Sequence, residues 1–233
     1  MWLVAEYQAT TLFTLKPALA TSSGAKTLLV PTPFAVKMAL LDVVCRTEGV
    51  SAGEAAWPLL RDLKVALRPA NRVVVTNLFA KILKPRRSPL QPGEAHAGPL
   101  QKTIAYREYA HFDGALGVAL AAEEADAEHL RQWLAGISYL GKRGSFLQLL
   151  RPPAPHEQLP AGYVLIDDQP PVRFPVESVM QQLDDCTESM TFDKANIYDK
   201  ATVRLGKERL LRHAILPFRV VASSRSYTLY ERV

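Results

Sequence analysis

The sequence of 233 residues is 48% hydrophobic, 22% charged and 8% aromatic. Such a chain can bury a sizeable core, and this composition excludes disorder over the whole length. Its two cysteines, Cys45 and Cys186, lie far apart without a partner motif, which excludes a disulfide scaffold and a cysteine-based zinc site. The net charge of +5 arises entirely from residues 1–150, since residues 151–233 hold equal numbers of acidic and basic side chains.

The opening segment predicts a strand. Residues 1–15 are rich in β-branched and aromatic side chains in rough alternation. No basic stretch precedes them and Glu6 interrupts the apolar run early, so we do not expect a secretory signal. No apolar run elsewhere is long enough to span a bilayer. We therefore expect a cytoplasmic protein that does not enter a membrane.

The next segment predicts a helix. Thr32 offers a hydroxyl for the N-cap, and Pro33 suits the first helical position. Four apolar residues follow at helical spacing and predict one buried face: Phe34, Met38, Leu41 and Cys45. We expect this helix to end before Gly49, and we expect Pro58 to divide a helical stretch at 54–63 into two short pieces.

A long hairpin with a flexible basic tip should follow. Residues 72–83 and 102–112 are rich in β-branched and aromatic side chains, and four prolines and two glycines lie between them. Nine basic residues and one acid, Glu94, lie between Lys64 and Arg107, and a second basic stretch runs over residues 200–219. Such clusters can hold a polyanion through phosphate contacts, or they can form a solvated face that is balanced by acids elsewhere in the fold.

The remaining pattern sets the expected fold class. Residues 115–121 predict a strand and residues 125–135 a helix, after which a short basic loop leads into an apolar strand. The order strand, helix, two hairpin strands, helix, strand predicts an α+β fold, with a ferredoxin-like (RRM-like) β-α-β-β-α-β arrangement and an enlarged hairpin. We assign this domain to residues 1–150.

Residues 151–233 predict a small, β-rich region punctuated by prolines. We expect a strand near 163–166, a helical piece around 176–183, and closing strands at 214–221 and 227–231.

The short basic loop, which we call the glycine loop (residues 141–145), is the first candidate site. Gly141 and Gly144 flank Lys142 and Arg143. Two glycines let the backbone approach a phosphate closely while its N–H groups and the two cations neutralise it. The spacing is not that of a Walker A loop. The alternative is a plain helix-to-strand turn with exposed charges.

Lys37 is the second candidate. It lies in the first turns of the helix that Thr32 and Pro33 begin, where free N–H groups attract anions. A lysine there is unfavourable against the helix dipole unless an anion lies nearby, which makes Lys37 a candidate phosphate contact. The alternative is a surface lysine whose stem covers apolar neighbours.

The hairpin is the third candidate, because aromatic and basic side chains interleave on it. Aromatic faces stack unpaired bases and cations hold the backbone, which is the chemistry of single-stranded RNA binding. Alternation places Tyr106 and Phe112 on one face and Tyr109 and His111 on the other, so one pair at most is free for bases, and the rings otherwise pack in the core or across strands. The candidate residues are Lys81, Lys84, Arg86, Arg87, Tyr106 and Arg107.

Catalytic and metal-binding patterns are weak. The five histidines lack metal-ligand spacing, and neither HExxH nor GxSxG occurs. The acid-rich run at 184–199 lacks the EF-hand pattern, so we expect it to be solvated or to face a partner, and we expect no metal or cofactor. The alternative is a metal-independent ribonuclease that uses Lys102, Tyr109 and His111 in acid–base catalysis.

Three segments together resemble the CRISPR-associated Cas-five family of the RAMP superfamily, whose members are subunits of type I Cascade complexes. They are PTPFAVKMALLD at the start of the first helix, the basic hairpin, and ISYLGKRGSF between the second helix and a strand. The resemblance covers chiefly residues 1–150, and the ending LPFRVVASSRSYTLYE is similar to the close of some members.

This resemblance implies a ferredoxin-like domain with a hairpin thumb that caps the 5′ handle of the crRNA. By position it places RNA contacts at Lys37, at Gly141 to Gly144 and on a thumb at about residues 83–102. As partners it implies the crRNA, a backbone subunit of the Cas-seven family and the large subunit that reads the PAM, with target DNA as a further candidate.

We therefore expect a non-catalytic RNA-binding subunit of a CRISPR surveillance complex. Most members of the family bind without cutting, while one subtype uses its member to cut the crRNA precursor. Two alternatives stay open: a metal-independent endoribonuclease that processes this precursor, and a general single-stranded RNA-binding protein outside any CRISPR system.

Overall fold

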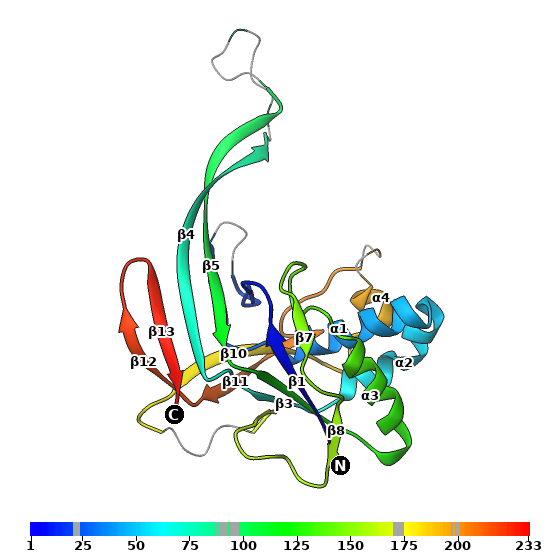
Figure 1. Ribbon diagram of the computed structural model, residues 1–233. Helices are drawn as coiled ribbons and strands as arrows, with labels where there is room; N and C mark the ends of the chain where they lie inside the picture. The colour runs from blue at the N-terminus through cyan, green and yellow to red at the C-terminus, as the bar shows by residue number, and fades with distance from the viewer. Residues whose placement is uncertain are drawn as a thin grey trace.

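The computed structural model describes residues 1–20, 24–86, 88, 93, 98–169, 175–196, 198 and 201–233. The fold is α+β, and nearly all its strand pairs are antiparallel. Helices lie on one side of the body, and a long hairpin projects from it (Figure 1).

The first sheet contains the opening strand, β1 (Trp2–Ala9). Its other strands are, in order away from β1, β6 (Leu116–Ala121), β3 (Val65–Arg68) and β9 (Val164–Ile166) on one side, and β7 (Leu147–Leu149) and β8 (Ala154–His156) on the other. Alternate residues of β1 are buried, and the hydroxyl of buried Tyr7 donates a hydrogen bond to the Leu134 carbonyl at 2.7 Å. The strands predicted near the start of the chain, at 115–121 and at 163–166 are confirmed.

Two helices begin and end close to where the sequence predicts. In α1 (Pro33–Thr47) the Thr32 hydroxyl accepts a hydrogen bond from the Ala35 N–H at 3.1 Å, as expected for the N-cap. The second, α3 (Ala127–Gly136), follows a short 3-10 turn (Glu124–Asp126). No helix among the described residues is long and apolar enough to cross a membrane.

Helix α2 (Val50–Asp62) is continuous through Pro58, so the prediction of two short pieces is wrong. Proline removes a single hydrogen bond here, the one to the Glu54 carbonyl. Burial of Trp57 and Leu60 holds the helix in place, and the Trp57 indole donates to the Met190 carbonyl at 2.7 Å.

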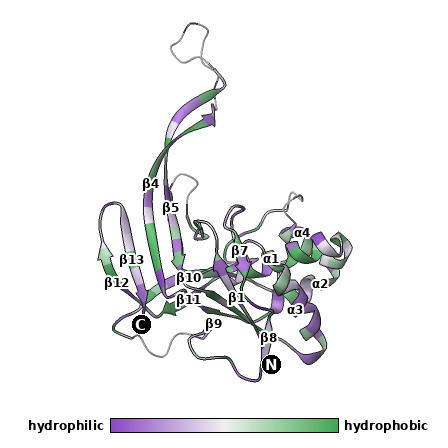
Figure 2. Cartoon of the chain, in the orientation of Figure 1, coloured by the Kyte–Doolittle hydropathy of each residue, from purple (hydrophilic) through white to green (hydrophobic). Residues whose placement is uncertain are grey.

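The predicted long hairpin is confirmed as β4 (Arg72–Pro85) and β5 (Leu100–Asp113), whose strands reach further outward than expected. The β3–β6 pair continues it in the same register, across a bend. At the bend Pro69 offers no N–H, and Gly114 has a φ of 98° that other residues rarely adopt. Figure 2 shows hydrophobic and hydrophilic residues interspersed along the projecting arm.

The C-terminal region contributes strands to both large sheets. In the second sheet, β12 (Phe218–Ser223) pairs with β13 (Tyr227–Arg232), and β13 pairs with β4. The short β2 (Gly24–Ala25) pairs with β5 in parallel.

The segment 176–183, predicted to be helical, instead leads into a strand. Strand β10 (Val179–Cys186) pairs along its full length with β11 (Arg209–Leu216), and Pro217 separates β11 from β12. Its last four residues are buried, and the strand packs against α1. This pairing and burial outweigh a weak helical spacing, as tertiary context commonly does for short apolar segments.

Candidate nucleic-acid interface

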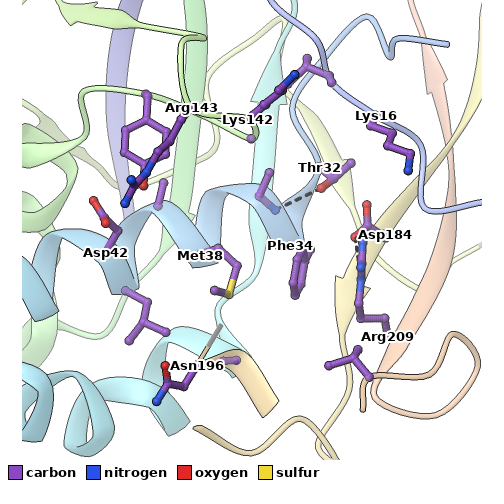
Figure 3. A pocket seen from close by; sticks show the side chains of 18 of the residues that line it. Lys16, Thr32, Phe34, Met38, Asp42, Lys142, Arg143, Asp184, Asn196 and Arg209 are labelled. Atoms are coloured by element: carbon purple, nitrogen blue, oxygen red, sulfur yellow. Dashed lines mark hydrogen bonds and ion pairs between the residues drawn. The ribbon is translucent and has the colours of Figure 1, made fainter. Parts of the chain in front are cut away.

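A groove of about 1060 Å³ lies between α1, the glycine loop and the C-terminal segment around α4 (Phe192–Ala195). In the close view of Figure 3, Lys142 and Arg143 lie on one side of α1, and Asp184 and Arg209 lie near Phe34. The lining mixes apolar and charged side chains. Its basic residues are Lys16, Arg107, Lys142, Arg143, Lys194 and Arg209.

The groove wall on α1 is built from residues that the sequence assigned to the core. Leu41 is buried as predicted, but Phe34, Met38 and Cys45 are only half-buried and line the groove with Asp42. Their helical spacing is correct and they pack against the core, but the predicted buried face is only partly buried, because the glycine loop and α4 leave it partly open. Residues that are fully buried on α1 include Val36, Leu40 and Val44.

The glycine loop is a tight, exposed turn. Gly141 and Gly144 have φ values of 74° and 98°, a conformation that glycine adopts without strain. The Ser145 N–H donates to the Lys142 carbonyl at 3.1 Å and closes the turn. The Thr11 hydroxyl donates to the Gly144 carbonyl at 2.7 Å, which ties the loop to the chain after β1. The loop therefore holds its two cations on a fixed backbone.

The cations of the groove differ in their pairing. Arg143 lies with Tyr139 and Asp42: burial raises the pKa of the Tyr139 hydroxyl, Asp42 raises it further, and Arg143 lowers it. Three others form no ion pair with any residue that the structure describes: Lys16, Arg107 and Lys142. Their charge is therefore available to an anion in the groove.

Lys37 does not reach the groove, and the prediction that it contacts phosphate is wrong. Its side chain is 2% exposed, and its Nζ donates to Asp185 Oδ1 at 2.6 Å and to the Arg61 carbonyl at 2.7 Å. Arg212 Nε donates to the other Asp185 oxygen at 2.9 Å. The anion that Lys37 requires is thus a carboxylate of the fold, which Lys37 and Arg212 share.

The start of the acid-rich run is also internal, so the prediction that it is solvated or faces a partner is wrong there. Asp184 and Asp185 are buried at the end of β10. Asp184 accepts a hydrogen bond from Arg209 Nε at 3.0 Å. The two carboxylates pair with cations of α1 and β11 because β10 lies between these elements. Asp199 lies outside the described residues.

On the hairpin, Tyr106 lies opposite Phe79 across the two strands. The ring centroids are 5.0 Å apart, and Phe79 is 71% exposed. The Tyr106 hydroxyl donates to Asn77 Oδ1 at 2.7 Å, which fixes its ring. This aromatic pair offers an exposed surface on which a base can stack.

The other predicted hairpin cations lie along the arm rather than in the groove. Lys81 is exposed and Lys84 is half-buried near the outer end of β4, and the Arg86 N–H donates to the Pro99 carbonyl at 2.9 Å. Arg87 lies outside the described residues. Apart from buried Lys37, the described site residues thus form two groups, one on the arm and one, with Arg107 and the glycine loop, at the groove.

The residues of the alternative nuclease are not brought together. Tyr109 and His111 lie two residues apart on one face of β5. Lys102 lies seven residues before Tyr109 on the same strand, roughly 23 Å away at about 3.3 Å per residue, and alternation places it on the opposite face. These three residues form no compact acid–base site.

Lys16 and Arg209 line the groove but were not among the site residues predicted from the sequence. Lys16 stands alone before Pro17 and belongs to no motif. Arg209 lay in a basic stretch whose only signal was local charge, and its place in the groove depends on the pairing of β10 with β11. Three members of that stretch are ion-paired to acids of neighbouring strands: Arg209, Arg212 and Arg219.

Glu208, at the base of this segment, should make stability depend on pH in acid. A hydrogen bond from the Lys194 side chain and one from the Arg204 N–H lower the pKa of Glu208 to about 2. Because this pKa lies below its value of 4.5 in the unfolded chain, the stabilisation is full above pH 4.5 and is lost as the pH falls toward 2. Glu208→Gln should therefore be less stable than wild type at pH 6, with the difference vanishing near pH 2. Urea unfolding of both proteins and of Glu54→Gln, an exposed control, tests this; a constant difference at all pH values would contradict it.

Known proteins that are similar to this chain bear on the family that it resembles. No family model matches the chain. The CRISPR-associated protein Cas5 of Archaeoglobus fulgidus is 25% identical over 118 residues, which are 50% of this chain and 49% of the relative. The chain thus spans about half the length of the curated relative that it matches.

Two solved structures match this chain with different TM-scores. A chain of a CRISPR RNA-guided surveillance complex superposes with a TM-score of 0.52 over 93% of this chain and 89% of that chain, at 15% identity. A CRISPR protein from Archaeoglobus fulgidus gives a TM-score of 0.47 over 100% and 92% of the two chains, at 12% identity. The first similarity shows a shared fold. The sequence relative confirms the resemblance that the helix start, hairpin and glycine loop indicate: over about half its length, the chain is similar to a CRISPR-associated Cas5 protein.

Proposed function

We propose that this protein is a non-catalytic RNA-binding subunit of a type I CRISPR surveillance complex, Cascade, and that it caps the 5′ handle of the crRNA. One observation carries the proposal. Three cations without an ion pair among the described residues, Lys16, Arg107 and Lys142, line one groove beside an exposed glycine turn. Phosphates of a single strand need such donors, and the half-buried wall of α1 offers apolar contact to bases.

The topology supports the same proposal. The strand order β7-β1-β6-β3, with α1 and α2 between β1 and β3 and α3 between β6 and β7, fits a ferredoxin-like arrangement whose central hairpin is enlarged. Sheets of this type bind single-stranded RNA in many proteins. The groove opens where the loop between α3 and β7 meets α1.

The projecting hairpin serves as the second contact surface in this proposal. Beside the Phe79–Tyr106 pair it carries Leu83 and Ile104, which are 60% and 63% exposed. Exposed apolar side chains interspersed with Lys81 and other cations suit a surface that touches RNA and protein at once. We propose that it contacts a backbone subunit of the Cas-seven family, while the body contacts the large PAM-reading subunit and, through it, target DNA.

One assay tests the binding role against its alternatives. The purified chain is incubated in EDTA with labelled CRISPR repeat RNA, and native and denaturing gels are run on the same samples. We expect a shifted, uncut RNA and weaker binding of a scrambled strand. A discrete cut within the repeat would make the protein a metal-independent endoribonuclease. Equal binding of the scrambled strand would make it a general RNA-binding protein, and no shift would contradict RNA capping by this chain.

A further inference from the structure

Arg209 is a groove-lining cation whose guanidinium contacts both an aromatic ring and a buried carboxylate. Its guanidinium carbon lies 4.1 Å from the centroid of the Phe34 ring, so the two planes are in contact. Its Nε donates to Asp184 Oδ2 at 3.0 Å, and its Nη2 contacts the same oxygen. Asp184 is itself 2% exposed. Figure 3 shows Arg209 and Asp184 together at the groove, close to Phe34. The guanidinium is therefore fixed in orientation by a ring and a buried carboxylate.

This fixed group keeps an unused donor edge. A guanidinium carries five N–H donors, and Asp184 takes two of them. Within the part of the chain that the structure describes, no residue accepts a hydrogen bond from Nη1, and this atom is not among the buried unpartnered ones. The Arg209 side chain is 27% exposed and lines the groove. If Arg209 served only to neutralise Asp184, its second donor edge would not need to be accessible from the groove.

We propose that Arg209 is a base-reading residue, which hydrogen-bonds the edge of one unpaired nucleobase in the groove; this inference rests on the proposed RNA-binding function. Asp184 already balances the charge of Arg209, so the guanidinium adds little to the general attraction of phosphate. Its rigid, planar edge instead holds N–H donors in fixed directions, which suits hydrogen bonds to a base edge. Lys16 and Lys142 are flexible point charges without an ion pair to a described residue, and they take the phosphates.

The chemistry of the edge selects the base. Parallel N–H donors pair best with two adjacent acceptors, as arginine does with O6 and N7 of guanine. Unpaired cytosine offers the same arrangement through O2 and N3, whereas adenine and uracil have no two adjacent acceptors. Arg209 should therefore favour guanine or cytosine at one position of the bound RNA.

The test uses Arg209→Lys, which keeps a cation beside Asp184 but loses the planar edge and the contact with Phe34. Its probes are the repeat RNA and a set of variants in which each guanine or cytosine is replaced in turn by adenine or uracil. For wild type we expect one replacement to weaken binding by about 5- to 150-fold, from the 1–3 kcal/mol typical of a paired contact. Arg209→Lys should lose this discrimination while the dependence of affinity on salt stays unchanged.

Two further variants keep the test sharp. Arg219→Lys is the matched control, because Arg219 pairs with Glu231 at 2.7 Å and does not line the groove; it should behave as wild type. Phe34→Leu leaves the Arg209–Asp184 pair in place but removes the ring, and it should lose part of the discrimination even if Arg209→Lys folds poorly. Thermal unfolding reports on the fold of each variant.

The outcomes separate this inference from the function on which it rests. Wild-type discrimination in folded Arg209→Lys would overturn base reading and leave RNA capping standing. A uniform loss of affinity over all RNAs would make Arg209 a phosphate contact or a structural partner of Asp184, which also overturns base reading. A wild-type chain that binds none of the RNAs would overturn the proposed function, and base reading with it.

Discussion

Replacing Asp185 by asparagine is expected to lower the free energy of unfolding by about 3–5 kcal/mol, the cost of leaving buried charges without a partner. The Asp185 carboxylate accepts hydrogen bonds from Lys37 Nζ at 2.6 Å, from Arg212 Nε at 2.9 Å and from the Cys186 N–H at 2.8 Å. Asparagine keeps the shape of the side chain and removes its charge, so the Lys37 ammonium, which is 2% exposed, stays in the core without a counterion. Urea unfolding measures the effect.

The matched control is Asp62→Asn. Asp62 pairs with Arg61 at 2.7 Å, but its side chain is 56% exposed, and exposed pairs contribute about 1 kcal/mol or less. Lys37→Met should also destabilise the fold, while the salt dependence of RNA binding by the folded variant stays as in wild type. A loss at Asp185 as small as that at Asp62, or a weaker salt dependence in Lys37→Met, would contradict the structural role of the pair.

Lys37 shows which features of the fold can be predicted from local sequence and which cannot. The N-cap and the first helical turn follow from Thr32 and Pro33 because capping involves residues three positions apart. The helix dipole correctly required an anion near Lys37. Whether that anion is an RNA phosphate or Asp185, 148 residues away, depends on how β10 packs on α1. No local pattern contains this information, and it decides between a binding residue and a core residue.

The absence of long-range information in local patterns also explains the other differences between the predicted and the observed elements. The hairpin strands were predictable because alternation and turn residues are local signals. The strand at β10 was not, since its stability comes from eight pairings with β11 and from burial against α1. Groove-lining Phe34 and Met38 have the helical spacing of a core face, and only the incomplete cover by α4 and the glycine loop leaves them half-open. The glycine loop itself was predictable, because its two glycines and two cations are contiguous.

That loop carries the prediction with the largest expected effect on binding. The double variant Lys142→Ala with Arg143→Ala should weaken binding of the repeat RNA and reduce the slope of log affinity against log salt by about 1.4, from about 0.7 per phosphate contact on a single strand. Both residues are exposed and line the groove, so the free energy of unfolding should change little. Affinities measured by filter binding between 50 and 300 mM salt, a range over which the screening length falls about 2.4-fold, give the slope.

The control must separate a local contact from the general loss of positive charge. Lys64→Ala with Arg225→Ala removes two exposed cations that do not line the groove, and so makes the same change in net charge. General attraction would lower the slope equally in both double variants, whereas phosphate contacts at the glycine loop would lower it in the first alone. Equal slopes in the two would remove the loop from the RNA site and leave Lys16, Arg107 and the hairpin to hold the strand. A loss of slope confined to the loop variant would place a phosphate within reach of the turn that Gly141 and Gly144 form, since both cations that this variant removes lie on that turn.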